Sequence, residues 1–254
     1  MIGWLRSIGF TICNLSATVV LALAMIPTLL LPRRAMPTVG RVWAAMVNGL
    51  VRGVIGSTIE YRGTEYMPTD AALVAVKHQS AWETSALLGI LPDACFILKN
   101  ELQLIPVFGW YLMKNKQVAV DRGAGAKALK SLLRGARAAA DAGRQIVIFP
   151  EGTRVPPGES RAYQPGVAAL YKALDLPVVP VALNSGVAWG RRRFIKRPSP
   201  IIVEFGEPIP PGLERKDFMD RLRAAIEPAT RRLEAEAWAA LEPKSCRRDP
   251  SDGA

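Results

Sequence analysis

The chain has 254 residues, half of them apolar, so it is long enough and hydrophobic enough to bury the core of one large domain. This composition excludes a globally disordered protein. The net charge of +11 predicts a surface that attracts anions, whether phosphorylated substrates, acidic carrier proteins, anionic lipids or nucleic acids. The three cysteines are far apart and odd in number, which argues against a disulfide framework or a zinc site and favours a reducing compartment.

The amino-terminal segment Ser7–Pro32 contains no charged residue and is almost continuously apolar. About 20 apolar residues are enough to cross the hydrocarbon layer of a bilayer. The pattern favours a membrane span, a re-entrant helix or an interfacial helix over a buried core helix or a cleaved signal peptide. Arg33, Arg34 and Arg41 follow the segment, whereas Arg6 alone precedes it, so the positive-inside tendency predicts that the rest of the chain faces the cytoplasm.

A second helix is predicted between Arg41 and Ile55, where apolar residues recur at helical spacing and Arg41, Asn48 and Arg52 fall on the opposite side. Its apolar face is suited either to a lipid headgroup surface or to packing on the core of the following domain. Two apolar helices ahead of a basic domain favour a lipid partner. Nucleic acid is not expected, because the arginines are scattered and no aromatic-basic recognition motif is present.

From residue 57 onward, short apolar runs alternate with helical stretches. This order predicts an α/β fold with a mixed, largely parallel sheet flanked by helices. The predicted strands are Thr58–Tyr61, Ala71–Val76, Ala94–Leu98, Gln117–Val120, Gln145–Phe149, Val178–Leu183 and Ile201–Phe205. The predicted helices are Trp82–Leu91, Ala124–Ala142, Gly166–Leu174 and Glu214–Leu241. We therefore divide the chain into amino-terminal helices (1–56), an α/β domain (57–242) and a disordered tail (243–254).

Polar loops follow three of the predicted strands, at Lys77–Ser80, Asp121–Gly123 and Pro150–Arg154. In sheets of this kind, active residues gather in the loops beyond the strand ends. The three loops are therefore expected to converge on one cleft.

The chain contains a single histidine, His78, and Glu83 follows it five residues later. Imidazole titrates near neutral pH, so His78 is the candidate general base, and a carboxylate on one ring nitrogen would raise the basicity of the other. The competing interpretation is a core histidine that is satisfied by a glutamate. No Gly-x-Ser-x-Gly elbow and no nearby cysteine offer a nucleophile on the protein. We therefore predict that His78 deprotonates a hydroxyl group of the substrate, which attacks an acyl carbon.

Arg122 and Arg154 each lie just beyond a strand, beside a glycine-containing turn. Guanidinium groups and turn N–H groups bind phosphate oxygens, so the two arginines are candidates for a phosphate cradle. Glu151 is expected to orient an arginine or the acceptor hydroxyl. For Asp121 and Arg122 the competing interpretation is a surface salt bridge.

Four strings in order resemble the motifs of the bacterial 1-acylglycerol-3-phosphate acyltransferases, which belong to a wider glycerolipid acyltransferase superfamily. They are K-H-Q-S-A-W-E (77–83), V-A-V-D-R (118–122), F-P-E-G-T-R (149–154) and V-V-P-V-A (178–182). The likeness covers about residues 57 to 210, and F-P-E-G-T-R together with an upstream histidine-to-acid motif is a specific signal.

The resemblance implies transfer of a fatty acyl group from an acyl-carrier protein or coenzyme A thioester to the sn-2 hydroxyl of a lysophosphatidate, which gives phosphatidate. It implies a bacterial enzyme at the inner membrane, with neither cofactor nor metal. It also implies His78 as general base, Glu83 as its orienting acid, and a substrate-binding set that we extend to flanking polar residues. That set is Lys77, Ser80, Lys99, Arg122, Glu151, Gly152, Thr153 and Arg154.

Two residues depart from the family pattern. Glu83 stands where aspartate is usual, one methylene longer, and Lys77 stands where asparagine is usual. We expect Lys77 either to attract an acidic carrier protein or phosphate, or to be simply solvated. These changes leave open a different acceptor, such as a lyso-ornithine lipid. The sequence is also compatible with a hydrolase or with a non-catalytic lipid-binding relative of the family.

Overall fold

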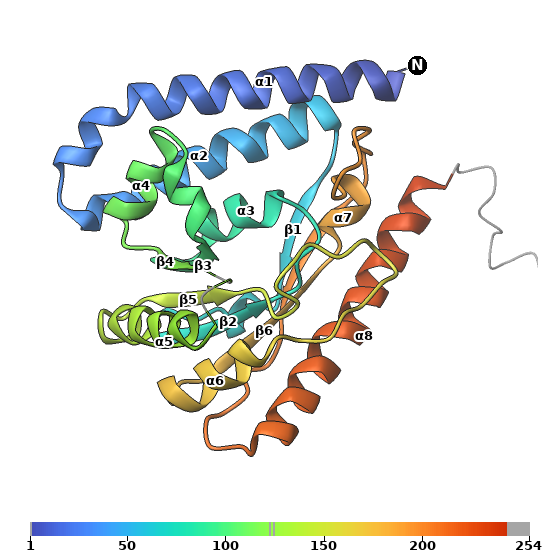
Figure 1. Ribbon diagram of the computed structural model, residues 1–254. Helices are drawn as coiled ribbons and strands as arrows, with labels where there is room; N and C mark the ends of the chain where they lie inside the picture. The colour runs from blue at the N-terminus through green and yellow to red at the C-terminus, as the bar shows by residue number, and fades with distance from the viewer. Residues whose placement is uncertain (1, 122, 124, 243–254) are drawn as a thin grey trace, which may run out of the picture.

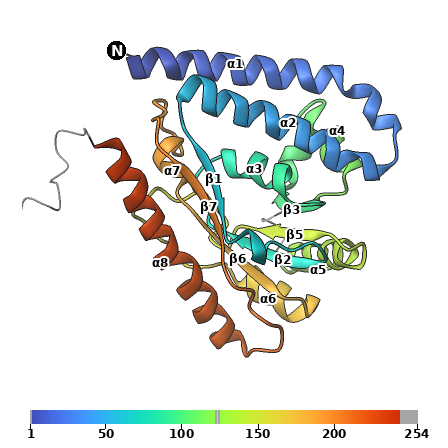
Figure 2. The same cartoon turned by 180° about the vertical axis from the view of Figure 1, so that it is seen from behind.

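The computed structural model describes residues 2–121, 123 and 125–242. A seven-stranded sheet forms the middle layer, and helices cover both of its faces (Figures 1 and 2). The strands are β1 (Ile59–Arg62), β2 (Ala72–Val76), β3 (Ala94–Lys99), β4 (Val118–Val120), β5 (Gln145–Ile148), β6 (Val178–Leu183) and β7 (Ile201–Phe205).

The strand order across the sheet is β1-β7-β6-β2-β5-β3-β4. All neighbouring strands are parallel except β6 and β7, which pair antiparallel. The predicted mixed, largely parallel sheet is therefore confirmed. β2 and β5 are adjacent and parallel, so the loops that follow them leave the same edge of the sheet.

The helices are α1 (Ile2–Ala24), α2 (Met36–Leu50), α3 (Trp82–Ile90), α4 (Phe108–Lys114), α5 (Ala126–Asp141), α6 (Pro165–Leu174), α7 (Ser185–Ala188) and α8 (Arg215–Leu241). The sequence did not predict α4 and α7, because seven and four residues are too few for a helical period to stand out. α2 and α3 cover one face of the sheet, with α1 outside them, and α6 and α8 cover the other face (Figures 1 and 2).

The central strand β2 is buried on both sides, and its side chains alternate between two cores. Leu73 and Ala75 pack in the cluster that also includes residues of α5, α6 and α8. Val74 and Val76 pack in the opposite cluster, with residues of α2 and α3. Continuous apolar runs such as this one are typical of strands that are covered on both faces.

α2 packs on the core of the α/β domain. Of the two interpretations of its apolar face, packing on the core is therefore correct for the part that is buried. Val47 in α2, with Val51 and Ile55 in the single π-turn 51–55 that follows it, is fully buried in the α2/α3 cluster. Asn48, expected on the polar side, faces α3 instead, where its Oδ1 accepts a hydrogen bond of 2.9 Å from Trp82 Nε1. The hydrophobic core therefore continues across residue 56, the predicted end of the amino-terminal segment.

α1 lies along α2. Large apolar side chains along the rest of its length are exposed. The helix over residues 3–24 is long and apolar enough to cross a membrane, and only 11% of its most apolar 18-residue stretch is buried in the molecule. The interpretation of α1 as an ordinary core helix is therefore wrong. The inner face is attached at several points, among them a 3.3 Å hydrogen bond from Trp43 Nε1 to Thr18 Oγ1.

Candidate active site

His78 and Glu83 form the predicted pair. The loop after β2 turns tightly enough for Glu83, in the first turn of α3, to reach back to the imidazole, and its Oε1 lies 2.9 Å from His78 Nδ1. The Glu83 side chain is fully buried, whereas 17% of the His78 side chain is exposed. A carboxylate on Nδ1 holds the proton there and leaves the lone pair of Nε2 for a substrate.

Glu83 is held by more than the histidine. Its Oε1 also accepts hydrogen bonds of 2.7 Å from the backbone N–H groups of Gln79 and Ser80, which follow His78 in the loop. Its other oxygen, Oε2, accepts a 2.9 Å hydrogen bond from Ser185 Oγ in α7. The sequence did not predict a role for Ser185, because 102 residues separate the two and no motif includes it.

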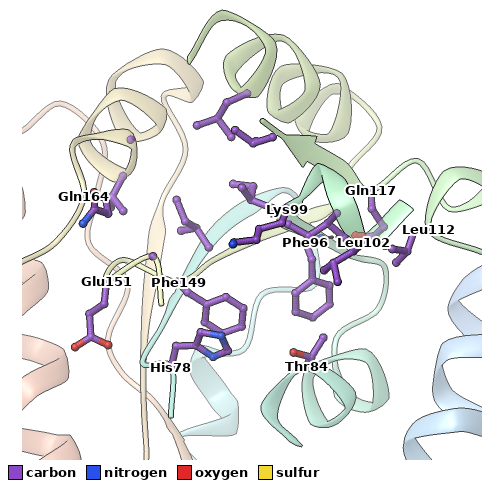
Figure 3. A pocket seen from close by; sticks show the side chains of 18 of the residues that line it. His78, Thr84, Phe96, Lys99, Leu102, Leu112, Gln117, Phe149, Glu151 and Gln164 are labelled. Atoms are coloured by element: carbon purple, nitrogen blue, oxygen red, sulfur yellow. Dashed lines mark hydrogen bonds between the residues drawn. The ribbon is translucent and has the colours of Figure 1, made fainter. Parts of the chain in front are cut away.

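Phe149 fixes the other side of the imidazole. The two rings stack with centroids 3.9 Å apart and planes 19° from parallel (Figure 3). The backbone N–H of Val155 also donates a 2.7 Å hydrogen bond to the carbonyl oxygen of His78. These contacts bring the loop after β2 and the F-P-E-G-T-R turn after β5 together, as the sequence predicted for two of the three loops.

A cavity of about 2020 Å³ opens beside His78. One wall consists of apolar side chains from the amino-terminal segment, α3, β3 and α4. That wall includes Leu21, Met25, Val39, Trp43, Leu88, Leu98, Phe108 and Leu112. The amino-terminal helices therefore help to enclose the site as well as covering the sheet.

Five of the predicted substrate-binding residues line this cavity: Lys99, Glu151, Gly152, Thr153 and Arg154. In Figure 3 Lys99 extends into the cavity, while the carboxylate of Glu151 points away from it. Gly152 adopts a φ of 67°, the left-handed conformation that suits glycine in a tight turn. These residues offer two cationic side chains, Lys99 and Arg154, to an anionic ligand.

Arg191 is a further cation in the cavity wall, and the sequence patterns did not predict it. Its Nη1 donates to Thr153 Oγ1 at 3.2 Å and to the carbonyl oxygen of Arg154 at 3.0 Å. The basic run that contains Arg191 follows α7 and not the end of a strand, so the rule that places active residues beyond strand ends does not point to it.

Lys77 is not placed to bind a substrate. Its side chain is completely buried, and its Nζ lies 2.7 Å from Glu151 Oε1 and 3.0 Å from Glu227 Oε2 in α8. Glu227 also accepts a 2.9 Å hydrogen bond from the hydroxyl of Tyr163. The predictions of a solvated Lys77 and of one that attracts a carrier protein are therefore both wrong, because carboxylates surround the ammonium group inside the molecule.

Burial raises the pKa of two carboxyl groups in this region. Desolvation raises the pKa of the Glu151 carboxyl above its ordinary value, and the hydrogen bond from Lys77 opposes that rise. Burial likewise raises the pKa of Glu234 in α8, whose oxygens accept hydrogen bonds from the Gly158 N–H and the Gln79 side chain. We refer to Lys77, Glu151, Glu227 and Tyr163 as the buried ionic cluster.

Ser80, also predicted to bind substrate, is buried away from the cavity. Its Oγ accepts a 3.1 Å hydrogen bond from the backbone N–H of Trp82, so it shapes the loop and the start of α3 and does not face a substrate. Arg122 lies outside the described residues. The preceding Asp121 accepts a 2.9 Å hydrogen bond from the N–H of Gly123.

The family model named Acyltransferase matches residues 58–184, which is half of the chain and includes both His78 and the F-P-E-G-T-R turn. The chain belongs to the acyltransferase family. Within this family, the curated 1-acyl-sn-glycerol-3-phosphate acyltransferase of Pseudomonas aeruginosa is 38% identical to the chain over 164 residues, which are 65% of the chain and 64% of the relative. The protein of that name from Cocos nucifera is 29% identical over 173 residues, 67% of the chain and 56% of the relative.

The match thus spans less than two thirds of the length of these two relatives. A solved structure extends the likeness of fold over nearly the whole chain. The crystal structure of the 1-acyl-sn-glycerophosphate acyltransferase from Thermotoga maritima superposes with a TM-score of 0.75 at 19% identity, and covers 91% of this chain and 98% of that one. At this identity the superposition establishes the fold.

Proposed function

We propose that the protein transfers a fatty acyl group from an acyl-carrier protein or coenzyme A thioester to the sn-2 hydroxyl of 1-acylglycerol-3-phosphate, which yields phosphatidate. The observation that carries this proposal is the His78–Glu83 pair at the edge of a cavity that has an apolar wall and also contains Lys99, Arg154 and Arg191. The apolar wall suits an acyl chain, and the cations suit the phosphate of the acceptor.

The reaction follows from the orientation of the imidazole. The acceptor hydroxyl attacks the thioester carbonyl while its proton passes to Nε2 of His78, and Glu83 on Nδ1 stabilises the imidazolium that forms. When the tetrahedral intermediate collapses, the C–S bond breaks and the imidazolium returns the proton to the leaving thiolate. One thiol and one ester result, and His78 regains its starting state.

Direct attack is the simplest course because the cavity supplies no strong protein nucleophile. Among the described residues that line it there is no serine or cysteine, the side chains that most often form acyl-enzyme intermediates. This course calls for neither a cofactor nor a metal. The thioester bond itself supplies the driving force.

We also propose that α1 lies in the bilayer interface and that the active site faces the cytoplasm at the inner membrane. α1 packs lengthwise against α2, which itself packs on α3, so its exposed stripe is oriented along the surface of the domain. A helix held in that way presents its apolar side to the acyl region of one leaflet. A lysolipid in that leaflet would have its headgroup near the cavity mouth.

The test is acyl transfer by the purified full chain to 1-acylglycerol-3-phosphate, with coenzyme A and carrier-protein donors in parallel. His78→Ala should lower kcat by about 1000-fold, within the range expected for loss of a general base. Glu83→Gln, which keeps the shape but not the charge of the orienting group, should lower it by about 100-fold. Arg221→Ala, on the exposed side of α8, is the matched control and should behave like the wild type.

Near-normal transfer by His78→Ala would refute the proposal. Release of free fatty acid at the same rate with and without acceptor would show a thioesterase instead. The assay should also include a panel of other lysolipids, among them lyso-ornithine lipid. If only one of these accepted the acyl group, the proposed reaction type would stand and the proposed acceptor would be wrong.

A further inference from the structure

The segment Gly190–Arg197, with the sequence G-R-R-R-F-I-K-R, carries five basic residues and no acidic one. It lies between α7 and β7, far from the histidine motif in sequence. In Figures 1 and 2 this part of the chain rises from α7 to the amino-terminal end of α1. We call it the basic segment.

The basic segment is attached to α1. The buried hydroxyl of Ser7 accepts a 2.9 Å hydrogen bond from the backbone N–H of Lys196. The rings of Trp4 and Phe194 lie 5.3 Å apart, and Trp189, just before the segment, meets Phe10 edge-on at 4.9 Å. The segment therefore has a defined position beside the helix that carries the long exposed apolar face.

Its outer side combines apolar and cationic groups. Trp4 is 54% exposed, Phe194 42% and Ile195 38%, and these large side chains continue the apolar face of α1 at its amino-terminal end. Arg192 and Arg193, next to them in the chain, are exposed as well. Aromatic rings beside arginines are the composition of protein surfaces that lie at the level of lipid headgroups.

We infer that the basic segment, together with Trp4, binds the headgroups of anionic lipids. Phe194, Ile195 and Trp4 would enter the interface beside α1, and the exposed Arg192 and Arg193 would pair with lipid phosphates and carboxylates. The charge of the segment indicates which lipids it binds. An apolar anchor alone would need no net charge, whereas five positive charges in eight consecutive residues favour an anionic leaflet over a neutral one.

The same segment reaches the active site. Arg191, its second residue, donates hydrogen bonds to Thr153 and to the backbone of Arg154 in the F-P-E-G-T-R turn. Lipid binding to the segment and the position of the turn that faces the acceptor are therefore linked through one side chain. This link to catalysis rests on the proposed function, whereas binding of anionic lipid by the segment does not.

The test is sedimentation of the full chain with vesicles of phosphatidylcholine alone and with vesicles that contain about one third phosphatidylglycerol. Arg192→Gln/Arg193→Gln should bind the anionic vesicles roughly 25-fold more weakly than the wild type, about fivefold per lost charge. Its binding to neutral vesicles should not change, because α1 is intact. Raising the salt concentration should reduce the difference between the two proteins.

Arg221→Gln/Arg231→Gln is the matched control, since it removes the same charge from exposed positions of α8. Equal losses in the two double variants would overturn the inference, because net charge alone would then explain binding. Normal binding of anionic vesicles by Arg192→Gln/Arg193→Gln would overturn it as well. If that variant also bound isolated acyl-carrier protein more weakly, the segment would be a protein-docking site. His78→Ala should bind vesicles normally, so failure of the proposed reaction is distinguishable from failure of this inference.

Discussion

Lys77 and His78 are adjacent in the chain and have opposite surroundings. His78 faces the cavity, stacks on Phe149 and contacts one carboxylate. Lys77 is turned into the protein, where its ammonium group contacts the carboxylates of Glu151 and Glu227. Both residues carry a basic side chain at the end of the same strand, so the residue type does not explain the difference.

The extended backbone at the end of β2 does explain it, because successive side chains of a strand point to opposite faces. Lys77 continues the face of Leu73 and Ala75, toward the core that includes α8, whereas His78 continues the face of Val74 and Val76. The comparison teaches that a motif residue has to be assigned to a face of the sheet before it is assigned a role.

The largest predicted effect concerns Lys77 and the free energy of unfolding. Lys77→Met leaves the carboxylates of Glu151 and Glu227 buried without their cation, and should lower the free energy of unfolding by about 3–5 kcal/mol. Chemical denaturation of the purified chain measures this. Adding Glu227→Gln to Lys77→Met should recover part of the loss, because one uncompensated charge is then removed.

Lys130→Met, at an exposed position of α5, is the control and should stay within about 0.5 kcal/mol of the wild type. If Lys77→Met proved equally mild while lysophosphatidate binding weakened, Lys77 would be a substrate residue after all. The contrast with His78 would then disappear.

A smaller predicted effect concerns the His78–Glu83 pair and the rate of the reaction. Ser185→Ala removes the donor to Glu83 Oε2 and should reduce kcat roughly tenfold, the equivalent of about 1.4 kcal/mol, with little change in KM. Ser185→Thr, which keeps the hydroxyl, should restore most of the activity.

A double-mutant cycle with Glu83→Gln separates positioning from a merely structural role. If Ser185 acts through Glu83, Ser185→Ala should have little further effect in the Glu83→Gln background. A full tenfold loss in that background would mean that Ser185 affects the reaction by another route.

The smallest effect is a dependence of stability on pH. Burial raises the pKa of Glu151 above its unfolded value of 4.5, so the folded protein binds this proton more tightly than the unfolded chain does. The stabilisation from that proton is complete below about pH 4.5 and is lost as the pH rises through the raised value. Relative to the wild type, Glu151→Gln should therefore become more stable as the pH rises across this window.

Thermal or urea unfolding of the two proteins at a series of pH values gives this difference directly. A difference that stays constant with pH would show that the Lys77 ion pair and the cost of burying Glu151 cancel. A difference that changes in the opposite direction would show that the ion pair outweighs that cost. In that case the cluster would stabilise the ionised carboxyl group.

Much of the architecture was predictable from local patterns. Seven apolar runs gave seven strands within a residue or so of their bounds, and the single histidine with an acid five residues later gave the pair at the cavity. Both signals are local: strand formation depends on runs of side chains, and a five-residue loop leaves few ways for Glu83 to approach His78.

Other features depended on the packing of distant segments. Ser185 reaches Glu83 across 102 residues, Glu227 reaches Lys77 across 150, and Arg191 joins the F-P-E-G-T-R turn from a segment with no recognised motif. No periodicity encodes such contacts, because they arise when α7 and α8 pack against the loops at one edge of the sheet. The sequence thus identified the His78–Glu83 pair and the fold class, whereas tertiary packing decided which of the charged neighbours line the cavity and which are buried.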